Sequence, residues 1–434
     1  MSQYQAIYDE KRRSVEELVA MIEPGEGIVL AAAGSEPLLI TQALNNAKQL
    51  KGNRLYRMLS MSPVVNLAKD QLKQFTFFLS GLDRKAMRNT DVDLIPSHFS
   101  EIPAIIKQRE PEPVMISQAS PMDEDGYFSF GLTAAYTPCT VEFAKKVFLE
   151  VNENMPHTHG EGMRIHISEV TAFVESSEDV VELPDIELSD KDRKIGEYVG
   201  DIIEDGSTIQ IGFGTIPNAV MNALSHKKNL GIHTEMLPSS IVDLYNNKVI
   251  TNEEKPVGKH RFSTTLALGN RRLYDFIDNN EDVEILPVNF INNIVELAKI
   301  ENLVSVNTTL EIDFLGQCNS EQLEDFYYSG TGGQSDFAVG ARIAANGVGI
   351  VCLYSTAKDD TISRIVPHLH SGSPVSTSKN DIEIVVTEYG VAHLKGKSIQ
   401  ERVQALIEVA HPKFRDGLRE EAIKLGYLEN KKLK

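Results

Sequence analysis

Short apolar runs alternate with amphipathic helical patterns along most of the chain. GIVLAAA at 27–33 and STIQIGFG at 207–214 are typical of buried strands, and each is followed by a turn and a helical pattern. Strands that are apolar along their whole length are buried on both faces, as in a parallel sheet covered by helices. We therefore predict the α/β class, with two α/β domains of similar architecture, each a mostly parallel sheet flanked by helices.

The length of 434 residues indicates more than one domain, because single cores stop growing near about 250–300 residues. The acidic, proline-containing stretch at 175–194 is the best linker candidate. After it, the order helix, strand, glycine turn, proline and helix repeats the order at 12–48. We expect an N-terminal domain at 1–185 and a C-terminal domain at 190–434.

Charge and composition exclude several classes of partner. The net charge of −19 argues against nucleic acid, whose phosphates need a basic face. No run approaches the roughly 18 apolar residues of a membrane span, and the charged start does not suggest a signal peptide. The three cysteines form no CxxC pair, so we expect neither disulfides nor a zinc ribbon, and a cytoplasmic location.

The histidines were weighed as metal ligands. His157, His159 and His166 lie close together, and His368 and His370 are two residues apart. No carboxylate or cysteine completes a known ligand spacing, so we expect no metal site. A serine or cysteine nucleophile is also disfavoured, since the chain has no GxSxG elbow and no cysteine with a histidine nearby in sequence.

Two glycine-rich turns precede helical patterns, at 212–214 (Gly-Phe-Gly) and at 330–333 (Gly-Thr-Gly-Gly). Backbone N–H groups at such turns can bind an anion, although a purely structural turn is the alternative at both. A dinucleotide fingerprint is incomplete, because Pro217 replaces its third glycine. Lys358 follows the apolar strand GVGIVCLYS and would suit an anionic ligand, or it is simply a solvated lysine.

Two glutamates lie in apolar runs. Glu235 belongs to GIHTEM at 231–236, and Glu388 follows the apolar strand IEIVVT. Each could be a surface glutamate, and the two could also converge on one pocket. The residue pattern alone does not decide between these interpretations.

Taken together and in order, ten segments resemble the acetyl-CoA hydrolase/transferase family of class I CoA-transferases, particularly its 4-hydroxybutyrate and butyryl-CoA:acetate CoA-transferase branch. The likeness covers nearly the whole chain. The segments are GSEP (34–37), DEDGYFSFG (123–131), NENMPHTHG (152–160), GFGTIPNAV (212–220), GIHTEM (231–236), NTTLEIDFLGQCNSE (307–321), GTGGQSDFAVGA (330–341), STAKDDTISRIVP (355–367), TEYGVAHLKGKS (387–398) and AHPKFR (410–415).

The resemblance implies roles for individual residues. Glu235 matches the glutamate that forms a glutamyl-CoA thioester, with Asn292 beside it, or the adjacent Asn293. Glu388 matches a glutamate near the small carboxylate. Backbone at Phe213 and Gly333 would form the oxyanion hole. The implied CoA contacts are Gln210, Ile211, Gly212, Phe213, Gly214, Leu310, Gly333 and Lys358.

The implied function is ping-pong transfer of CoA between an acyl-CoA and a small carboxylate, such as acetate with butyryl- or 4-hydroxybutyryl-CoA. CoA is then a substrate, no cofactor is bound permanently, and a homodimer or higher homo-oligomer is expected. An acyl-CoA hydrolase with the same site is the alternative, and a non-catalytic CoA-binding protein is disfavoured because Glu235 is retained. Two departures from the family pattern, Ser335 and His393, could alter acyl preference.

CoA is a polyanion, whereas the chain is strongly acidic. Any CoA site must therefore be locally positive, through helix N-termini, backbone N–H groups or a placed lysine.

Overall fold

The computed structural model describes residues 3–429. The chain divides into two compact units, and each is treated by itself. The first comprises Met1–Pro184, Glu235–Ser239 and Arg261–Asn292, and the second comprises Asp185–Thr234, Ser240–His260 and Asn293–Lys434. The predicted domains at 1–185 and 190–434 were continuous segments, whereas the first unit includes two later ones. The domain boundaries therefore stay a prediction.

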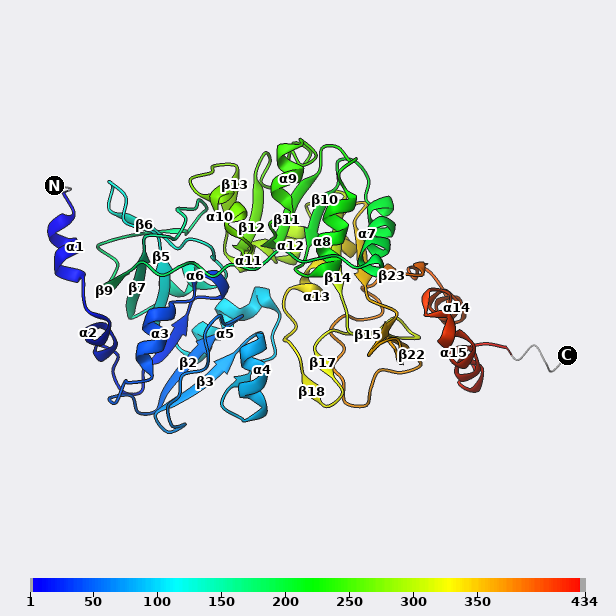
Figure 1. Ribbon diagram of the computed structural model, residues 1–434, viewed down its shortest axis with the longest axis horizontal. Coiled ribbons are helices and arrows are strands. Elements are labelled where there is room, and N and C mark those ends of the chain that lie inside the picture. The colour runs from blue at the N-terminus through cyan, green and yellow to red at the C-terminus, as the bar shows by residue number, and fades with distance from the viewer. Residues whose placement is uncertain (1–2, 430–434) are drawn as a thin grey trace. The chain divides into compact units, whose positions relative to one another are not determined.

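The first sheet has the strand order β4-β3-β2-β1-β5-β7-β9 (Figure 1), and all its neighbouring strands are parallel. Residues of β1 and β5 are buried along their whole length, as expected for central strands covered on both faces. Its strands are β1 (Gly27–Leu30), β2 (Asn53–Arg57), β3 (Leu72–Thr76), β4 (Asp93–Leu94), β5 (Val114–Ala119), β7 (Lys146–Asn152) and β9 (Ala172–Ser176).

Short helices and one small antiparallel pair of strands complete this part of the chain. They are α1 (Gln5–Lys11), α2 (Val15–Ala20), α3 (Leu38–Leu44), α4 (Gly81–Arg88), α5 (Ile102–Arg109), α6 (Thr137–Val141), the 3-10 turns η1 (Ala33–Ser35) and η2 (Phe99–Glu101), and strands β6 (Tyr127–Ser129) and β8 (Arg164–His166). The strand predicted at 27–33 ends early, because Ala33 adopts a φ of 51° and begins η1.

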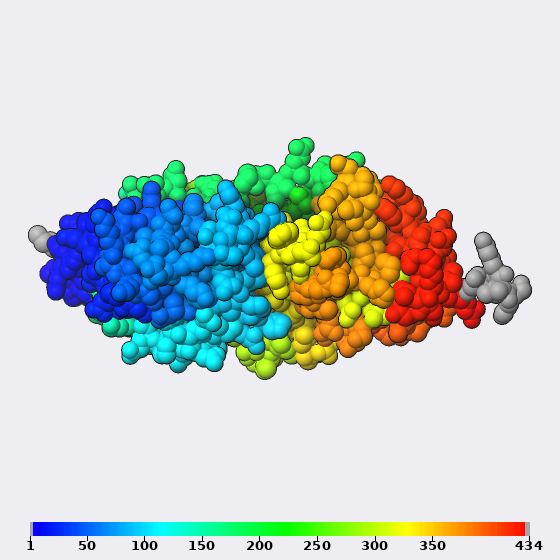
Figure 2. Space-filling view, turned by 90° about the horizontal axis from the view of Figure 1, so that it is seen from below, coloured from blue at the N-terminus to red at the C-terminus, as the bar shows by residue number. Residues whose placement is uncertain are grey.

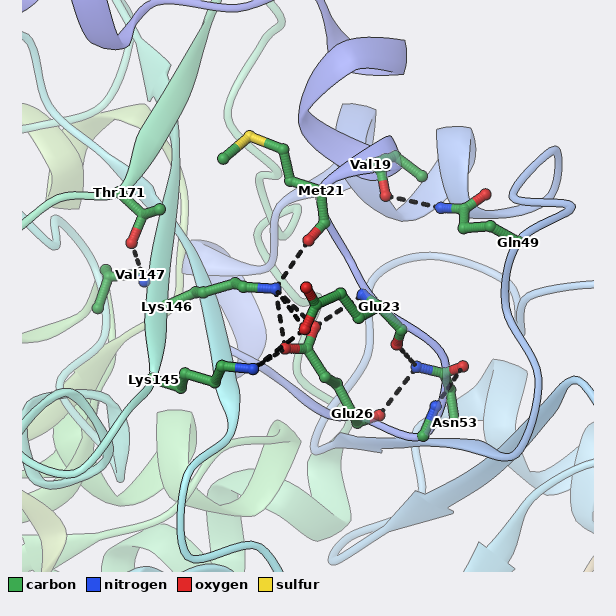
Figure 3. Close-up of polar contacts among 11 residues, drawn as sticks. Val19, Met21, Glu23, Glu26, Gln49, Asn53, Lys145, Lys146, Val147 and Thr171 are labelled. Atoms are coloured by element: carbon green, nitrogen blue, oxygen red, sulfur yellow. Dashed lines mark hydrogen bonds and ion pairs between the residues drawn. The ribbon is translucent and has the colours of Figure 1, made fainter.

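At the N-terminal ends of the strands of the first sheet, lysine and glutamate side chains form ion pairs with one another (Figure 3). Lys146 Nζ lies 2.8 Å from Glu26 Oε1 and donates to the Met21 carbonyl, while Lys145 Nζ lies 3.1 Å from carboxylate oxygens of both Glu23 and Glu26. The Asn53 amide donates to the carbonyls of the same two glutamates. This network joins the N-terminal ends of β1, β2 and β7.

At the carboxyl edge of the first sheet, the strand order reverses between β1 and β5, which is where open α/β sheets hold ligands. Buried charges occupy this position. Arg57 Nη2 lies 3.7 Å from Glu36 Oε1, and Arg57 Nε lies 3.5 Å from Asp83 Oδ1, with all three side chains at most 1% exposed. Ser62 Oγ also donates to Glu36 at 2.8 Å, and Gln118 of β5 donates to the Glu36 carbonyl.

The second sheet has the order β13-β12-β11-β10-β14-β19-β23-β24. The strand pairs β10–β11, β10–β14, β12–β13, β14–β19 and β19–β23 are parallel, and β24 runs antiparallel to β23. The strands are β10 (Thr208–Ile211), β11 (Gly231–Leu237), β12 (Phe262–Ala267), β13 (Val283–Ile285), β14 (Leu303–Thr308), β19 (Val348–Cys352), β23 (Ile384–Thr387) and β24 (Gly390–His393). Two mostly parallel sheets flanked by helices confirm the predicted fold class.

Helices α7 and α8 pack closely within the second unit (Figure 1). Gly196 of α7 permits this contact, because a Cβ there would lie 2.5 Å from the Ala219 carbonyl oxygen. The helices in the second half of the chain are α7 (Asp190–Ile202), α8 (Thr215–Ala223), α9 (Ile241–Asn246), α10 (Arg271–Ile277), α11 (Val288–Ile291), α12 (Ile294–Leu297), α13 (Gln334–Ile343), α14 (Ile399–Val409) and α15 (Pro412–Lys424).

A layer of short strands covers one region of the second unit. Figure 2 shows the yellow segment near 310–330 against the orange segment near 350–380, and β15 pairs with β22 at their contact. Helices α14 and α15, in red, lie beyond the orange segment. The strands are β15 (Glu311–Asp313), β16 (Cys318–Asn319), β17 (Gln322–Leu323), β18 (Phe326–Tyr327), β20 (Thr356–Ala357), β21 (Ile362–Ser363) and β22 (Ile365–Val366).

Candidate active site

The turn after β10 is shaped by glycine. Gly214 has a φ of 131°, which side chains with a Cβ rarely adopt, and it is the N-cap of α8. The first N–H groups of α8 have no partner within the helix, so they are available to an anion. Phe213, between the two glycines, is 43% exposed.

A cavity of about 380 Å³ lies beside this turn. The strand order of the second sheet reverses between β10 and β14, and residues following β10, β14 and β19 form the cavity wall. This is the crevice where doubly wound sheets bind ligands. The lining residues are Phe213, Gly214, Thr215, Ile216, Pro217, Thr308, Thr309, Leu310, Tyr328, Cys352, Leu353, Tyr354 and Arg364.

Three of the predicted CoA contacts, Phe213, Gly214 and Leu310, line this cavity, whereas Gln210 and Ile211 lie buried beneath the turn. The Gln210 carboxamide accepts a hydrogen bond from Ser305 Oγ at 2.8 Å and another from Asn307 at 3.0 Å. Its side chain therefore fixes β10 against β14. Gly212 precedes the cavity-lining residues in the turn.

The GIHTEM segment forms β11 and is fixed to the glycine turn by Thr234. Its hydroxyl donates to the Ile211 carbonyl at 2.7 Å and accepts from the Ile211 N–H at 3.1 Å. The buried His233 ring packs edge-on against Phe337 of α13, with ring centroids 6.4 Å apart. Gly333 is the buried N-cap of that helix. The motif thus ties together the segments that carry the two glycine turns.

Glu235 follows Thr234 directly and is partly buried. Asn292 Nδ2 donates to Glu235 Oε2 at 3.0 Å, and Thr264 Oγ1 donates to the Glu235 carbonyl at 3.1 Å. Asn292 is fully buried at the C-cap of α11, whereas Asn293 is the N-cap of α12 and accepts from the Val295 N–H. Of the two neighbouring asparagines, Asn292 is the one that contacts the Glu235 carboxylate.

Lys358 begins an unusual turn between β20 and β21. Lys358, Asp359 and Asp360 have successive φ values of 49°, 53° and 61°, a left-handed conformation that L-residues seldom adopt in sequence. Asp360 is held by Lys191 Nζ at 2.6 Å and by Thr356. The Lys358 side chain is 65% exposed and pairs with an exposed carboxylate, Glu324, at 3.0 Å.

Glu388 is buried behind this turn. Its two carboxylate oxygens accept hydrogen bonds from the N–H and the hydroxyl of Ser355, at 2.9 and 2.8 Å, and Lys191 Nζ lies 3.7 Å away. These contacts fix the start of the 355–360 segment. The resemblance had suggested a place near the small carboxylate for Glu388, and that role stays a prediction.

Two cavity residues were missed by the sequence analysis. Tyr354 donates to Asp192 and lies 2.7 Å from Thr215 Oγ1, and burial, together with its bond to Asp192, raises its pKa to about 12. Arg364 Nη1 donates to the Leu310 carbonyl at 2.8 Å. Arg364 lies in the recognised segment STAKDDTISRIVP, but nothing in its spacing distinguishes it from a surface arginine.

The two departures from the family pattern have ordinary surroundings. Ser335, in the first turn of α13, donates to the Ser376 carbonyl. His393 is exposed on the edge strand β24. Neither residue lines the cavity beside the glycine turn.

Comparison with known proteins identifies the family. The family model "Acetyl-CoA hydrolase/transferase N-terminal domain" matches residues 1–184, and the corresponding "C-terminal domain" model matches residues 269–422. The chain belongs to the acetyl-CoA hydrolase/transferase family. The resemblance inferred from the sequence motifs is thereby confirmed.

Individual members of the family are similar over nearly their whole lengths. The succinyl-CoA:cyclohexane-1-carboxylate CoA transferase of Geobacter metallireducens is 40% identical, covering 98% of this chain and 97% of that protein. The 4-hydroxybutyrate coenzyme A transferase of Clostridium kluyveri is 39% identical, covering 96% and 99%. The crystal structure of RipA from Yersinia pestis superimposes with a TM-score of 0.91 at 32% identity, covering 98% and 100%.

Within residues 3–429, no group of three or more histidine, cysteine or acidic side chains could hold a metal ion. In the same range, no helix is both long and apolar enough to cross a membrane.

Proposed function

We propose that this enzyme moves CoA between an acyl-CoA and a small carboxylate through a glutamyl-CoA thioester on Glu235. The chain is a CoA-transferase, since relatives that carry this name share 39–40% of their residues with it over nearly the whole length. The observation that carries the finer proposal is the hydrogen bond from the buried Asn292 amide to the Glu235 carboxylate.

The first half-reaction begins when a Glu235 carboxylate oxygen attacks the acyl-CoA carbonyl carbon. The tetrahedral intermediate collapses to a mixed anhydride and expels CoA as its thiolate. The thiolate then attacks the glutamyl carbonyl, the anhydride C–O bond breaks, and the acyl group leaves as a free carboxylate. An incoming acid reverses these steps, and CoA leaves on the new acyl group.

A glutamate is chemically suited to this exchange. A glutamyl thioester is itself a carboxylic thioester, so the intermediate lies close in free energy to both substrates. The Asn292 amide can orient the carboxylate through a neutral N–H donor. Because an amide cannot protonate the carboxylate, the attacking oxygen keeps its negative charge.

The oxyanion requires preorganised donors, each worth about 3 kcal/mol in the transition state. We assign this role to backbone N–H groups at Phe213 and Gly333. The φ of Gly214 and the N-cap position of Gly333 support the assignment, because both hold glycine-rich backbone at a helix start.

CoA binding is assigned to the cavity beside the 212–214 turn and to Lys358. The exposed ion pair of Lys358 with Glu324 is worth no more than about 1 kcal/mol. A CoA phosphate can therefore replace Glu324 at little cost. Binding energy from these remote contacts can then lower the barrier at the thioester.

For the acyl partners, we propose acetate with butyryl- or 4-hydroxybutyryl-CoA. A single methylene changes transition-state binding by only about 1–3 kcal/mol, so several short acids should be accepted. A competition assay with equimolar acetate, butyrate and 4-hydroxybutyrate ranks them by kcat/KM. A strong preference for an acid outside this set would contradict the assignment.

The experiment that tests the mechanism uses acyl-CoA alone. Intact-mass and peptide mass spectrometry should detect CoA bound to the peptide that contains Glu235, and kinetics should be ping-pong. An adduct on a different residue, or none in a catalytically active preparation, would disprove the mechanism.

The hydrolase alternative is separated by thioester loss measured with and without acetate. Transfer predicts that loss accelerates strongly when acetate is added. Equal rates in the two conditions would identify a hydrolase.

We also propose a homodimer or larger homo-oligomer in the cytoplasm, and light scattering of the purified protein tests the assembly.

A further inference from the structure

We infer that Arg364 binds a phosphate group of CoA in the cavity beside the 212–214 turn. The inference rests on the proposed function, because it assumes that CoA occupies this cavity. It adds a cationic residue to a CoA site for which the sequence motifs had supplied only Lys358.

The position of Arg364 is fixed by its backbone. Its N–H donates to the Ser355 carbonyl, and its carbonyl accepts from the Ile312 N–H, each at 2.9 Å. Arg364 therefore lies between β21 and β22, held on one side by the segment that leads to Lys358 and on the other by β15. Its side chain reaches the cavity wall and cannot swing away with a loop.

The guanidinium has donors to spare. It carries five N–H groups, and one hydrogen bond, to the Leu310 carbonyl, is recorded for it among residues 3–429. That bond orients the guanidinium beside another cavity residue. A planar group with several remaining donors matches the paired oxygens of a phosphate.

The charge of Arg364 points to an anionic ligand. Among the described residues, its guanidinium forms no ion pair within 4.0 Å, and the charge of Glu311 acts on it only from a greater distance. Partial burial lowers the pKa of Arg364, as expected for a cation removed from water. A cation in this position gains stability when an anion enters.

The start of α8, which also lines the cavity, supports the same ligand. Gly214 and Thr215 begin α8, whose first N–H groups carry partial positive charge. An anion in the cavity would thus have both a helix start and Arg364 in the surrounding wall. Among the substrates of the proposed reaction, acyl-CoA carries phosphate groups. These groups are distant from the reacting carbonyl, so they can bind in a cavity away from the Glu235 carboxylate.

The test measures binding rather than turnover. Calorimetric titrations of wild type, Arg364→Gln and Arg364→Lys use free CoA, dephospho-CoA and pantetheine. Arg342→Gln is the matched control, because Arg342 lies in the same unit and is paired with Asp381 at 2.7 Å. Thermal unfolding of each variant checks that it is folded.

Arg364→Gln should raise the Kd for CoA about 10- to 100-fold, the range for a lost charge-assisted bond. The Kd for pantetheine should change less than about twofold, and Arg364→Lys should recover part of the loss for CoA. An equal loss for dephospho-CoA assigns Arg364 to the diphosphate, whereas a loss confined to CoA assigns it to the 3′-phosphate. Arg342→Gln should bind all three ligands as wild type does.

Equal weakening of CoA and pantetheine, or an unchanged Kd for CoA, would overturn the inference. Should Arg364→Gln not fold, Arg364→Lys and competition by inorganic diphosphate in the wild type decide the question. Diphosphate should displace CoA but not pantetheine. Failure of the Glu235 thioester test would leave these binding results intact, so the two proposals can fail separately.

Discussion

The two sheets present the same type of crevice and use it differently. In each, the strand order reverses beside the first strand, between β1 and β5 in one and between β10 and β14 in the other. The first crevice is filled by Glu36, Arg57 and Asp83, which neutralise one another below the surface. The second keeps a cavity of about 380 Å³ and an arginine, Arg364, that forms no ion pair among the described residues.

The difference shows that the strand order creates a crevice in each sheet, whereas the side chains around it determine whether the crevice can bind a ligand. After β1, a 3-10 turn brings Glu36 inward, where it accepts hydrogen bonds from Ser62. After β10, the glycine turn projects no charged side chain, and α8 starts at Thr215. One crevice is therefore a structural core of buried charge, and the other remains open to a ligand.

The largest expected effect is on the reaction. Replacing the carboxylate in Glu235→Gln should lower transfer by about four orders of magnitude or more, because the nucleophile is lost. Stability should change little, since glutamine can still accept from Asn292. Glu296→Gln is the control, because Glu296 lies on α12 and is paired with Lys299 at 2.6 Å. Steady-state transfer and thermal unfolding measure both quantities, and normal turnover in Glu235→Gln would refute its role.

A second substitution tests the closed crevice. Arg57→Met should destabilise the fold by about 3–5 kcal/mol, because two buried carboxylates lose their cation. Once temperature is low enough for the variant to fold, its Kd for CoA should match that of wild type. Arg364→Gln should show the reverse, with weak binding and nearly unchanged stability. If both variants lost stability alike, the proposed contrast between the crevices would be wrong.

Glu150 offers a test by pH. It is buried on β7, accepts from the Ile40 N–H, and burial raises its pKa to about 7. The folded state thus binds this proton more tightly than the unfolded state, so the contribution of Glu150 to stability is largest at low pH and is lost as pH rises through about 7. The loss should reach about 3 kcal/mol.

Glu150→Gln removes this titration. Urea unfolding at several pH values between 5 and 8 should show that the variant gains stability relative to wild type as pH rises. Glu169→Gln, at a solvent-exposed glutamate of the same unit, is the control. A constant difference between Glu150→Gln and wild type across this range would contradict the expectation.

Much of the fold could be predicted from sequence patterns, whereas some of the strand ends beside the crevices could not. Continuous apolar runs predicted β1 and β10, because full burial leaves that pattern. The glycine turn at 212–214 was predicted where β10 ends, whereas the end of β1 was placed too late because Ala33 adopts a positive φ that its sequence does not indicate.

The candidate site was predicted unevenly for a physical reason. The resemblance implies roles for Glu235 and the glycine turn, whereas the local sequence of neither Arg57 nor Arg364 indicates what its side chain contacts. Arg57 is paired with two buried carboxylates, whereas Arg364 forms no ion pair among the described residues, and this difference depends on residues distant in the chain. Which asparagine contacts Glu235 also required the structure, because Asn292 and Asn293 are adjacent.

The smallest expected effect concerns Lys358. Lys358→Gln should raise the KM for acyl-CoA about three- to tenfold at low salt and less at high salt, since an exposed charge is screened. Lys395→Gln is the control, because Lys395 is similarly exposed and pairs with Glu383. An effect of Lys358→Gln as large as that of Arg364→Gln would mean that the exposed lysine, and not the cavity, dominates CoA binding.

Under the proposed role of Lys358 in CoA binding, the left-handed turn at 358–360 sets thermal stability and substrate affinity against each other. Its middle residue, Asp359, would lose roughly 1–2 kcal/mol of steric strain if replaced by glycine. The same change would loosen the backbone that aims Lys358. Directed evolution for heat resistance should therefore accumulate Asp359→Gly, and selection at scarce acyl-CoA should remove it.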